Sequence, residues 1–352
     1  MTWERTTARD VAERAGVHPS TVSRSLDPFS RANVSEATRL RVERVARELG
    51  YRPDLTASSL RRRSSRTIGV LISSFSNPIY GELLHGVTDE LEELGYHVLI
   101  AEVPDVLGTD RMSAAVDMLG SRRIDGLICA ASRGGDAEVL RRLVDSGLPV
   151  VLSLRWIASS GIPRVVNDDA LGGELAARHL LELGHRRVVE ITGPTDISTF
   201  SERARGFREA LATSSPRATL RSVEATTPSI DEGYRAMSEA LQAGPGAPPT
   251  AVFAHNDLLA VGALTVLQER GVDCPGSVSV VGYNDSPLTG HLDPPLTTIR
   301  LQIDRMGREA ARAVVTAIAQ SGPVAPELSL PPDLIVRGST APVTGAGAAQ
   351  PS

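Results

Sequence analysis

Residues 7–26, TARDVAERAGVHPSTVSRSL, predict two short helices joined by a tight turn. Thr7 is a suitable amino-terminal cap, and apolar residues then recur at helical spacing as far as Ala15. Gly16 ends this helix because its backbone reaches the left-handed conformation without strain. Pro19 fits the first turn of a second helix, which fills the rest of the stretch. This spacing is typical of a helix-turn-helix.

A third helix is expected from Glu36 to Leu49, where it would close a small apolar core. Its core-facing residues are predicted to be Leu40, Val42, Val45, Ala46 and Leu49. The second helix carries side chains that suit base edges and phosphates, which are short polar groups followed by an arginine. These residues are Ser20, Thr21, Ser23 and Arg24. A plain helical hairpin fits the apolar spacing equally well, so the spacing alone leaves the function open.

Charge is divided unevenly along the chain of 352 residues. Residues 1–66 hold 14 Arg and 8 acidic residues, a net charge of +6, whereas the remainder holds 23 Arg and 34 acidic residues, a net charge of -11. A basic first fifth joined to an acidic body favours a nucleic-acid-binding module attached to a separate domain. A solvated helical face also carries such charge, so the division supports the helix-turn-helix without establishing it.

The composition excludes several classes of protein. No apolar run approaches the length of a membrane-spanning helix, and the amino end opens on charged residues without a secretion segment. Cys129 and Cys274 cannot form a disulfide framework and lack metal-ligand spacing. We therefore expect a cytoplasmic protein without a metal site or a cofactor.

From Thr67 onward, apolar strand-like runs alternate with amphipathic helical segments. Strands are expected at 68–72, 96–101, 124–130, 150–154, 187–192, 251–254 and 278–282. Helices are expected at 80–95, 110–121, 136–146, 171–183, 201–212, 231–242 and 258–270. This alternation predicts parallel sheets covered on both faces, and the length suffices for two lobes. Because ligands of such sheets bind beyond the carboxyl ends of the strands, we expect a cleft between the lobes.

The body shows no sequence signature of an enzyme. It contains no Gly-x-Gly-x-x-Gly turn, no P-loop, no Gly-x-Ser-x-Gly elbow and no clustered His or Cys ligands. His255 is the histidine expected near the cleft, and a single buried histidine is more often structural. We predict no catalytic residues. A secreted sugar-binding receptor is a further alternative, but it would need an export signal and would not begin with a helix-turn-helix.

Longer motifs identify a family resemblance. They include Asp10-Val11-Ala12, Thr21-Val22-Ser23-Arg24, Leu49-Gly50-Tyr51-Arg52-Pro53, Ser76-Asn77-Pro78, Gly184-His185-Arg186-Arg187 and Leu296-Thr297-Thr298-Ile299. Together they resemble the LacI-type transcription regulators, and the resemblance continues to about Arg337. It implies an all-α helix-turn-helix headpiece at 1–53 and a hinge helix with its linker at 54–65. A two-lobed α/β domain with parallel sheets, similar to periplasmic sugar-binding proteins, is implied at 66–340. The remaining residues, 341–352, are expected to form a disordered tail without the heptads of a tetramer-forming coiled coil.

The resemblance also implies which residues contact DNA. Base-reading positions are matched by Pro19, Ser20 and Arg24, and backbone-contacting positions by Thr7, Thr21, Ser23, Asn33 and Tyr51. In the hinge, the residues that match minor-groove positions are Ala57 and Leu60. Leu60 matches the apolar wedge that unstacks a central base step. Two departures make the operator non-transferable from relatives: Ser25 replaces an apolar residue, and Pro19 replaces a side chain that often reads a base.

In the cleft, the resemblance implies effector contacts from Ser76, Tyr80, Arg155, Arg203, Asn256, Asp257 and Asn284. Arg203 matches the arginine that clamps the effector. For Asp257 and Asp285, a role as a helix cap or turn residue fits equally well. Two substitutions remove polar groups that relatives commonly hold, at Leu154 and Leu301. They favour an effector less polar than a simple hexose, or a site that uses Arg155, Gln302 and Asn167 instead.

The function implied is that of a sequence-specific DNA-binding transcription repressor. We expect a homodimer on palindromic double-stranded DNA, because one headpiece offers few contacts for a specific affinity. Its operator binding would be controlled by a small-molecule effector, a sugar or related metabolite, in the cleft. The alternative is a co-repressor-dependent regulator of the purine-repressor type, which uses the same fold.

Overall fold

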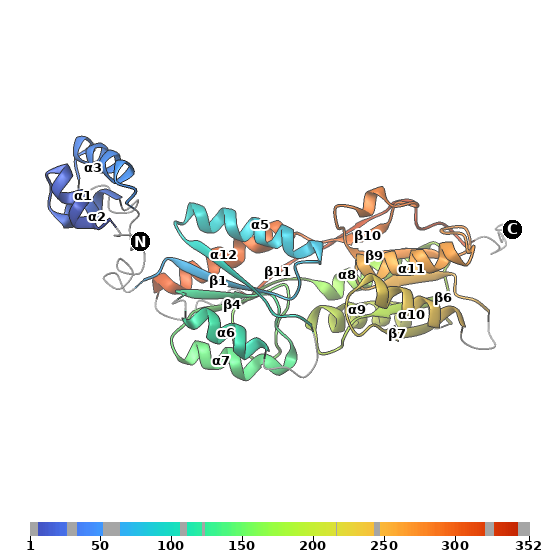
Figure 1. Cartoon of the computed structure of the whole chain (residues 1–352). Helices are drawn as coiled ribbons and strands as arrows, with labels where there is room; N and C mark the ends of the chain where they lie inside the picture. Colours follow the sequence, from blue (N-terminus) through green and yellow to red (C-terminus); the bar gives the residue numbers. More distant parts are fainter. Residues whose placement is uncertain are drawn as a thin grey trace. The chain divides into compact units, whose positions relative to one another are not determined.

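The structure is a computed structural model of the whole chain. It describes residues 6–26, 34–51, 64–105, 111–121, 124–215, 217–242, 247–320 and 327–343. The chain divides into two compact units, Met1–Ser65 and Arg66–Ser352, which Figure 1 draws. Asn33, Ala57 and Leu60 lie outside the described residues, as does most of the predicted hinge. None of the helices in the described part combines the length and apolar character that a membrane span requires.

The described part of the first unit contains three helices, as predicted for the headpiece. It contains α1 (Ala8–Ala15), α2 (Pro19–Leu26) and α3 (Glu36–Glu48). Gly16 caps α1 in the left-handed conformation with φ 62°, and its amide donates to the Ala12 carbonyl. The buried core consists of Val11, Ala12, Ala15, Val22, Val42, Val45 and Ala46. The placement of Leu40 in this core was wrong, because its side chain is 52% exposed. It lies two residues before Val42, which turns it away from the buried face of a helix with 3.6 residues per turn.

The amino-terminal lobe of the second unit contains a six-stranded sheet in the order β11-β5-β4-β3-β1-β2. Its strands are β1 (Thr67–Ile72), β2 (His97–Glu102), β3 (Gly126–Cys129), β4 (Val150–Ser153), β5 (Arg164–Asn167) and β11 (Glu327–Leu330). Each of these neighbouring pairs is parallel. The helices of this lobe are α5 (Pro78–Glu93), α6 (Arg111–Ser121), α7 (Ala137–Asp145) and α12 (Ile303–Gln320).

The carboxyl-terminal lobe repeats this arrangement with the order β12-β10-β9-β8-β6-β7. Its strands are β6 (Arg187–Thr192), β7 (Thr219–Glu224), β8 (Ala251–Ala254), β9 (Ser279–Asn284), β10 (Thr297–Arg300) and β12 (Asp333–Ile335). The pairs are parallel except for β12, which lies antiparallel to β10 at one edge. The helices of this lobe are α8 (Asp169–Glu182), α9 (Ser198–Ser214), α10 (Ile230–Gln242) and α11 (Asp257–Glu269).

The described chain passes between the two lobes at three places, from β5 to α8, from β10 to α12, and from β11 to β12 (Figure 1). The second passage returns the chain to the amino-terminal lobe, where α12 packs against α5. Two glycines permit this close approach: a Cβ at Gly86 would collide with the Asp304 carbonyl, and one at Gly307 with the Leu83 carbonyl. The carboxyl ends of the strands in both lobes therefore face a common interlobe region.

The predicted parallel α/β architecture is confirmed, with small shifts at the ends of elements. The sequence pattern did not predict β5, β7, β10, β11, β12 and α12. β7 is an edge strand in which only Val223 is buried, so it lacks an apolar run. The predicted disordered tail begins at Ala341, whereas Ala341 and Val343 donate backbone hydrogen bonds to Ser279 Oγ and the Leu183 carbonyl. Residues 344–352 lie outside the described residues.

Candidate functional site

The predicted DNA-contacting residues of α2 lie on and beside its accessible face. Ser20 and Arg24 are exposed, while Pro19, Thr21 and Ser23 are partly exposed. Arg24 lies along the helix, because its Nε donates to the Ser20 carbonyl at 3.3 Å and its Nη2 to Thr21 Oγ1 at 3.5 Å. These weak contacts leave the guanidinium available to a partner. The geometry suits a helix that enters a major groove.

The amino end of α1 presents Thr7 in a capping box. Thr7 Oγ1 accepts from the Asp10 amide at 3.4 Å, and Asp10 Oδ2 accepts from the Thr7 amide at 2.7 Å. The hydrogen bond from the Thr7 amide holds the pKa of Asp10 below its usual value. Helix amino termini attract phosphates, so Thr7 occupies a suitable backbone-contacting position. Tyr51, by contrast, is partly buried and packs against the headpiece core.

Ser25, the departure from the family pattern in α2, is buried in the headpiece. Its side chain is 1% exposed. Its Oγ has no hydrogen-bond partner among the described residues. A buried hydroxyl without a partner destabilises a fold by about 1–3 kcal/mol. Ser25 therefore weakens the headpiece.

A cavity lies between the two lobes of the second unit, with about 310 Å³ of space that is partly open to solvent. Its lining residues are Asn77, Ile79, Tyr80, Leu154, Arg155, Thr199, Phe200, Arg203, Pro228, Asn256 and Asn284. This set brings together Tyr80, Arg155, Arg203, Asn256 and Asn284 from the sequence-predicted effector residues. Ser76 and Asp257 do not line it. Ser76 is exposed, and its amide donates to Ser74 Oγ at 3.1 Å.

Arg155 lines the cavity on the side of the amino-terminal lobe, and its positive charge is balanced by the carboxylate of Asp105. Its Nη1 and Nη2 donate to the two carboxylate oxygens of Asp105, each at 2.6 Å, and its Nη2 also donates to Ser73 Oγ at 3.1 Å. Tyr80 belongs to the same network, because its hydroxyl lies 2.7 Å from Ser73 Oγ. Burial acts to raise the pKa of Asp105, but hydrogen bonds and charge from Arg155 outweigh it and lower that pKa. The pair is therefore ionised and neutral as a whole.

Arg203 lines the carboxyl-terminal side and is also paired. Its Nε donates to Asp169 Oδ1 at 2.8 Å, and its Nη1 donates to the His255 carbonyl at 2.5 Å. The guanidinium stacks 3.7 Å from the ring centroid of Tyr283, whose hydroxyl donates to Asp169 Oδ1 at 3.0 Å. Arg203 is thus a buried structural ion pair whose side chain also lines the cavity.

Two asparagines complete the polar part of the cavity. Asn256 caps α11, with its Oδ1 accepting from the Leu259 amide at 2.8 Å. Asn284 ends β9, and its buried Oδ1 has no partner among the described residues. Asp257 instead serves the adjoining turn, because its carboxylate accepts from the Ser286 amide and from Thr298 Oγ1, both at 2.7 Å. Burial without a cationic partner raises the pKa of Asp257 to about 6.

The other residues named from the sequence do not line the cavity. His255 is fully buried, and its Nε2 pairs with Glu190 Oε1 at 3.0 Å. Gln302 donates from Nε2 to the Pro331 carbonyl at 3.0 Å. Asn167 is buried, and both of its amide atoms are without partners among the described residues. The part of the chain that the structure describes holds no group of His, Cys, Asp and Glu suited to a metal ion.

Sequence reasoning missed several lining residues and both acidic partners. The missed lining residues are Asn77, Ile79, Thr199, Phe200 and Pro228, whereas Leu154 was named as a substituted position in the cleft. Asn77 could have been predicted from the sequence, since it directly precedes Pro78 at the first strand–helix junction. The sequence feature that indicates Asp169 is weaker: it is an acidic residue at the start of a helix. No sequence feature indicates Asp105, because it lies 50 residues from Arg155 in the chain.

Comparisons with known proteins agree with this geometry. Residues 7–54 match the family described as bacterial regulatory proteins, lacI family, and residues 177–340 match the periplasmic binding protein-like domain. The chain is 34% identical over 340 residues to the ribose operon repressor of Escherichia coli (strain K12), covering 95% of this chain and 99% of that protein. The solved structure of the lac repressor dimer bound to operator and the anti-inducer ONPF has a TM-score of 0.84 and 27% identity, covering 96% of this chain and 100% of that chain. A LacI family regulator from Enterococcus faecium with bound ribose has a TM-score of 0.70 and 28% identity, covering 79% of this chain and 100% of that chain.

Proposed function

The chain belongs to the lacI family of bacterial regulatory proteins, and on this premise we propose that it represses transcription as a homodimer released from a palindromic operator by a neutral sugar. It is a sequence-specific DNA-binding regulator under effector control, not an enzyme. Because its target is chromosomal DNA, its proposed location is the cytoplasm. Similarity to the ribose operon repressor favours this function over the co-repressor-dependent alternative.

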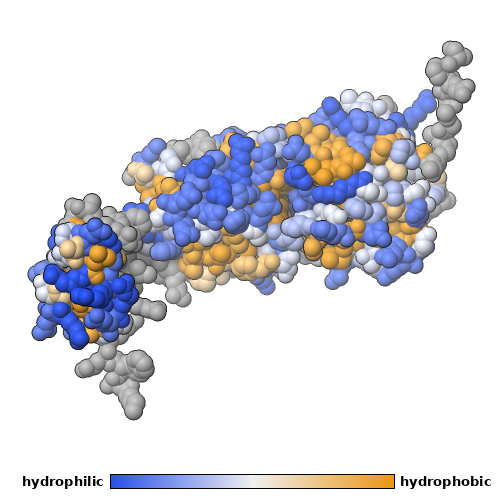
Figure 2. Space-filling model, turned by 90° about the horizontal axis from the view of Figure 1, so that it is seen from above, coloured by the Kyte–Doolittle hydropathy of each residue, from blue (hydrophilic) through white to orange (hydrophobic). Residues whose placement is uncertain are grey.

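A second copy of the chain is the proposed partner of an apolar surface on the carboxyl-terminal lobe. Ile230 and Tyr234 on α10 are 44% and 40% exposed, and Leu288, after β9, is 71% exposed. Figure 2 shows a hydrophobic area over this lobe beside largely hydrophilic surface. Exposed apolar patches of this kind are typical of subunit interfaces. Two headpieces related by a twofold axis would read two half-sites, so the operator is expected to be palindromic.

One observation carries the proposed effector class: each arginine that lines the cavity is paired with a buried carboxylate, although Asp105 also lies 3.8 Å from Arg133 Nη1. Arg155 is paired with Asp105 and Arg203 with Asp169, at 2.6 and 2.8 Å. An anionic ligand would therefore meet no net positive charge, and its desolvation would go uncompensated. A neutral ligand with several hydroxyls fits better, because these groups leave hydrogen-bonding atoms without adding charge.

The shape of the lining supports a sugar ring. Donors and acceptors come from Asn256, Asn284 and Arg203, while Ile79 and Phe200 offer apolar contacts to the hydrogens of a ring. The polar residues supply hydroxyl partners that the substitutions at Leu154 and Leu301 had placed in question. We therefore propose a free sugar over a less polar effector. D-Ribose is the first candidate, because a similar protein binds ribose.

The experiment is isothermal titration calorimetry of the full chain with D-ribose, D-ribose 5-phosphate, cellobiose and hypoxanthine. The neutral sugar is expected to bind at least about tenfold more tightly than its phosphorylated form, since both arginines among the described lining residues are already paired with carboxylates. Operator DNA is then selected from random sequence, and the bound sugar should lower its affinity. Tighter binding of the phosphorylated sugar or of hypoxanthine would refute the neutral-sugar proposal.

A further inference from the structure

The turn after β9 joins the effector cavity to the segments that connect the lobes. Asn284, the last residue of β9, lines the cavity, and Asp285 follows it. Both have positive φ, 117° for Asn284 and 57° for Asp285. Such conformations raise the energy of residues other than glycine and persist where surrounding contacts enforce them. The contacts of Asp285 therefore identify what holds this turn.

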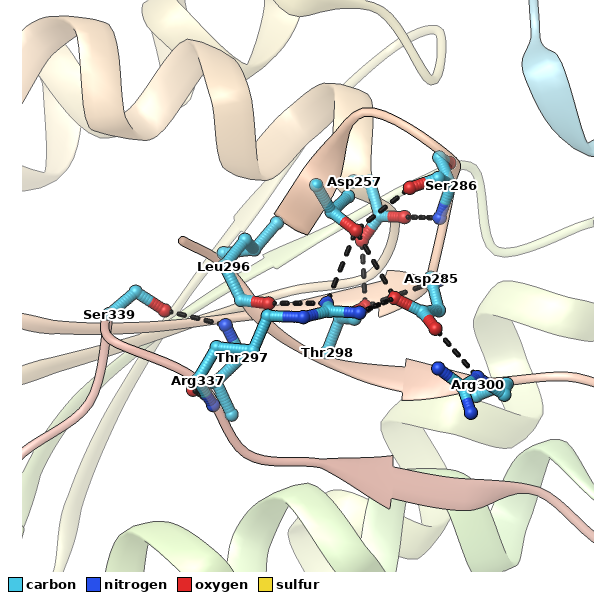
Figure 3. A network of polar contacts seen from close by, with 10 residues as sticks. Asp257, Asp285, Ser286, Leu296, Thr297, Thr298, Arg300, Arg337 and Ser339 are labelled. Atoms are coloured by element: carbon cyan, nitrogen blue, oxygen red, sulfur yellow. Dashed lines mark hydrogen bonds and ion pairs between the residues drawn. The ribbon is translucent and has the colours of Figure 1, made fainter. Parts of the chain in front are cut away.

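Three donors converge on the carboxylate of Asp285, and Figure 3 labels two of them, Arg300 and Arg337. Arg300 Nε donates to Oδ2 at 2.6 Å, and Arg337 Nη2 donates to Oδ1 at 2.6 Å. Thr289 Oγ1 donates to Oδ1 at 3.1 Å. Burial acts to raise the pKa of Asp285, but hydrogen bonds from Arg337 and Arg300 outweigh it and lower that pKa. The carboxylate is therefore charged at neutral pH.

The two arginines lie in or just after strands that adjoin the segments passing between the lobes. Arg300 ends β10, directly before the passage into α12. Arg337 follows β12, which the chain enters after its passage from β11. One carboxylate thus links the turn that carries Asn284 to the end of β10 and to the segment after β12, and each of these strands adjoins a passage between the lobes. In Figure 3, Asp285 lies between Arg300 and Arg337.

The other side of this turn is fixed as well. Asp257 accepts from the Ser286 amide at 2.7 Å and from Thr298 Oγ1 at 2.7 Å. Thr298 Oγ1 also accepts from the Asp285 amide at 3.3 Å. A shift at Asn284 therefore cannot be absorbed within the turn, since the neighbouring backbone is tied to α11 and to β10. Such a shift passes to the connecting segments.

We propose that Asp285 is a positioning residue that couples effector binding at Asn284 to the arrangement of the connecting segments, and so to operator affinity. The inference rests on the proposed effector site and adds the route by which binding there acts on the lobes. A ligand hydroxyl that donates to the unpartnered Oδ1 of Asn284 favours one geometry of the turn. Through Asp285, that geometry favours one arrangement of Arg300 and Arg337.

The test is a D-ribose titration in which the affinity of the full chain for selected operator DNA is measured. It gives two separate quantities: the D-ribose concentration at the midpoint of the change, and the plateau, which is the change in operator affinity at saturating D-ribose. Saturating D-ribose should change the operator affinity of the wild-type protein by about tenfold, within the usual range of allosteric coupling. Asp285→Asn should reduce that change to less than about twofold, because the two arginines lose their shared anion. Asn284→Ala removes the ligand contact that sets the turn, so it should raise the ribose concentration at the midpoint and also lower the plateau. Asp117→Asn, at an exposed position on α6, is the matched control and should alter neither.

A second variant and a ligand-free measurement keep the proposal falsifiable. Arg300→Gln removes one link through a side chain that is 52% exposed, so it should fold and lower the plateau in part. Without ligand, amide hydrogen exchange in residues 297–303 and 333–340 should be about fivefold faster in Asp285→Asn. The proposal would be overturned if Asp285→Asn exchanged at the wild-type rate. It would also be overturned if Asp285→Asn and Arg300→Gln both kept the wild-type plateau. If the wild-type protein binds no D-ribose, the proposed effector fails and the exchange result alone decides this inference.

Discussion

The headpiece and the effector cavity present their binding groups in opposite ways. In α2, the predicted DNA-contacting residues follow one another along a single helix, and the hydrogen bonds of Arg24 to other described residues are weak, at 3.3 and 3.5 Å within that helix. In the cavity, Arg155 and Arg203 are buried and each is paired with a carboxylate from a distant segment. The headpiece therefore offers a free charge to DNA, whereas the cavity offers directed donors without net charge. This difference suits a polyanion in one case and a neutral ligand in the other.

The largest effect that this comparison predicts is at Arg203. Arg203→Ala removes the donor in the cavity and leaves Asp169 buried without its cation. We expect D-ribose affinity to fall by about 100-fold, because the site loses a polar contact and gains an unpaired carboxylate. The separate cost to the stability of the second unit is about 3–5 kcal/mol. Calorimetry measures the affinity, and circular dichroism shows whether the second unit remains folded. Arg203→Lys, which keeps the charge, should recover only part of the affinity; full recovery would mean that charge alone suffices.

Arg24 tests the headpiece side. Arg24→Ala should weaken operator binding by about 1–3 kcal/mol and relax sequence preference at one base pair of each half-site. Arg9→Ala, at an exposed position on α1, serves as a comparison for simple loss of positive charge. Fluorescence anisotropy at several salt concentrations separates the two effects. Equal losses on operator and random DNA would show that Arg24 contacts only phosphates.

The pH dependence of the stability of the second unit tests the effect of burial on Asp257, which follows the cavity-lining Asn256. Burial raises the pKa of Asp257 to about 6. Because its folded pKa exceeds its unfolded value, Asp257 contributes stability that is fully present below about pH 4 and is lost as the pH rises through 6. We expect a loss of about 1–2 kcal/mol between pH 4.5 and 7 that Asp257→Asn lacks. Urea denaturation at a series of pH values measures this step; an identical pH profile in the variant would contradict it.

The smallest predicted effect concerns the unpartnered hydroxyl of Ser25. Ser25→Ala removes a buried polar group without adding volume, so the headpiece should gain about 1 kcal/mol of stability. The thermal transition of the headpiece within the full chain measures this gain. Ser23→Ala, at a partly exposed position two residues earlier, should give no comparable gain. Lower stability in Ser25→Ala would indicate that the hydroxyl has a hydrogen-bond partner.

The same contrast explains how much could be predicted from sequence. Local spacing predicted α1 to α3, because caps, glycine and apolar periodicity act within a few residues. It misplaced Leu40, where an apolar side chain lies off the buried face. The cavity was predicted only in part, because its geometry depends on pairs far apart in the chain. Arg155 and Asp105 are 50 residues apart, and Arg203 and Asp169 are 34 apart. Five lining residues were named as effector contacts through the family resemblance, but their partners carry no local signal.

The three passages between the lobes also set the order in which the protein can be completed during synthesis. Each sheet receives an edge strand from the last described part of the chain, β11 in one lobe and β12 in the other. Neither lobe is finished until these strands leave the ribosome, whereas α12, which packs against α5, is synthesised before them. The described core of the headpiece is built from residues close together in the chain, so it can fold first. A nascent repressor would thus hold a formed DNA-binding module before it holds the cavity that regulates it.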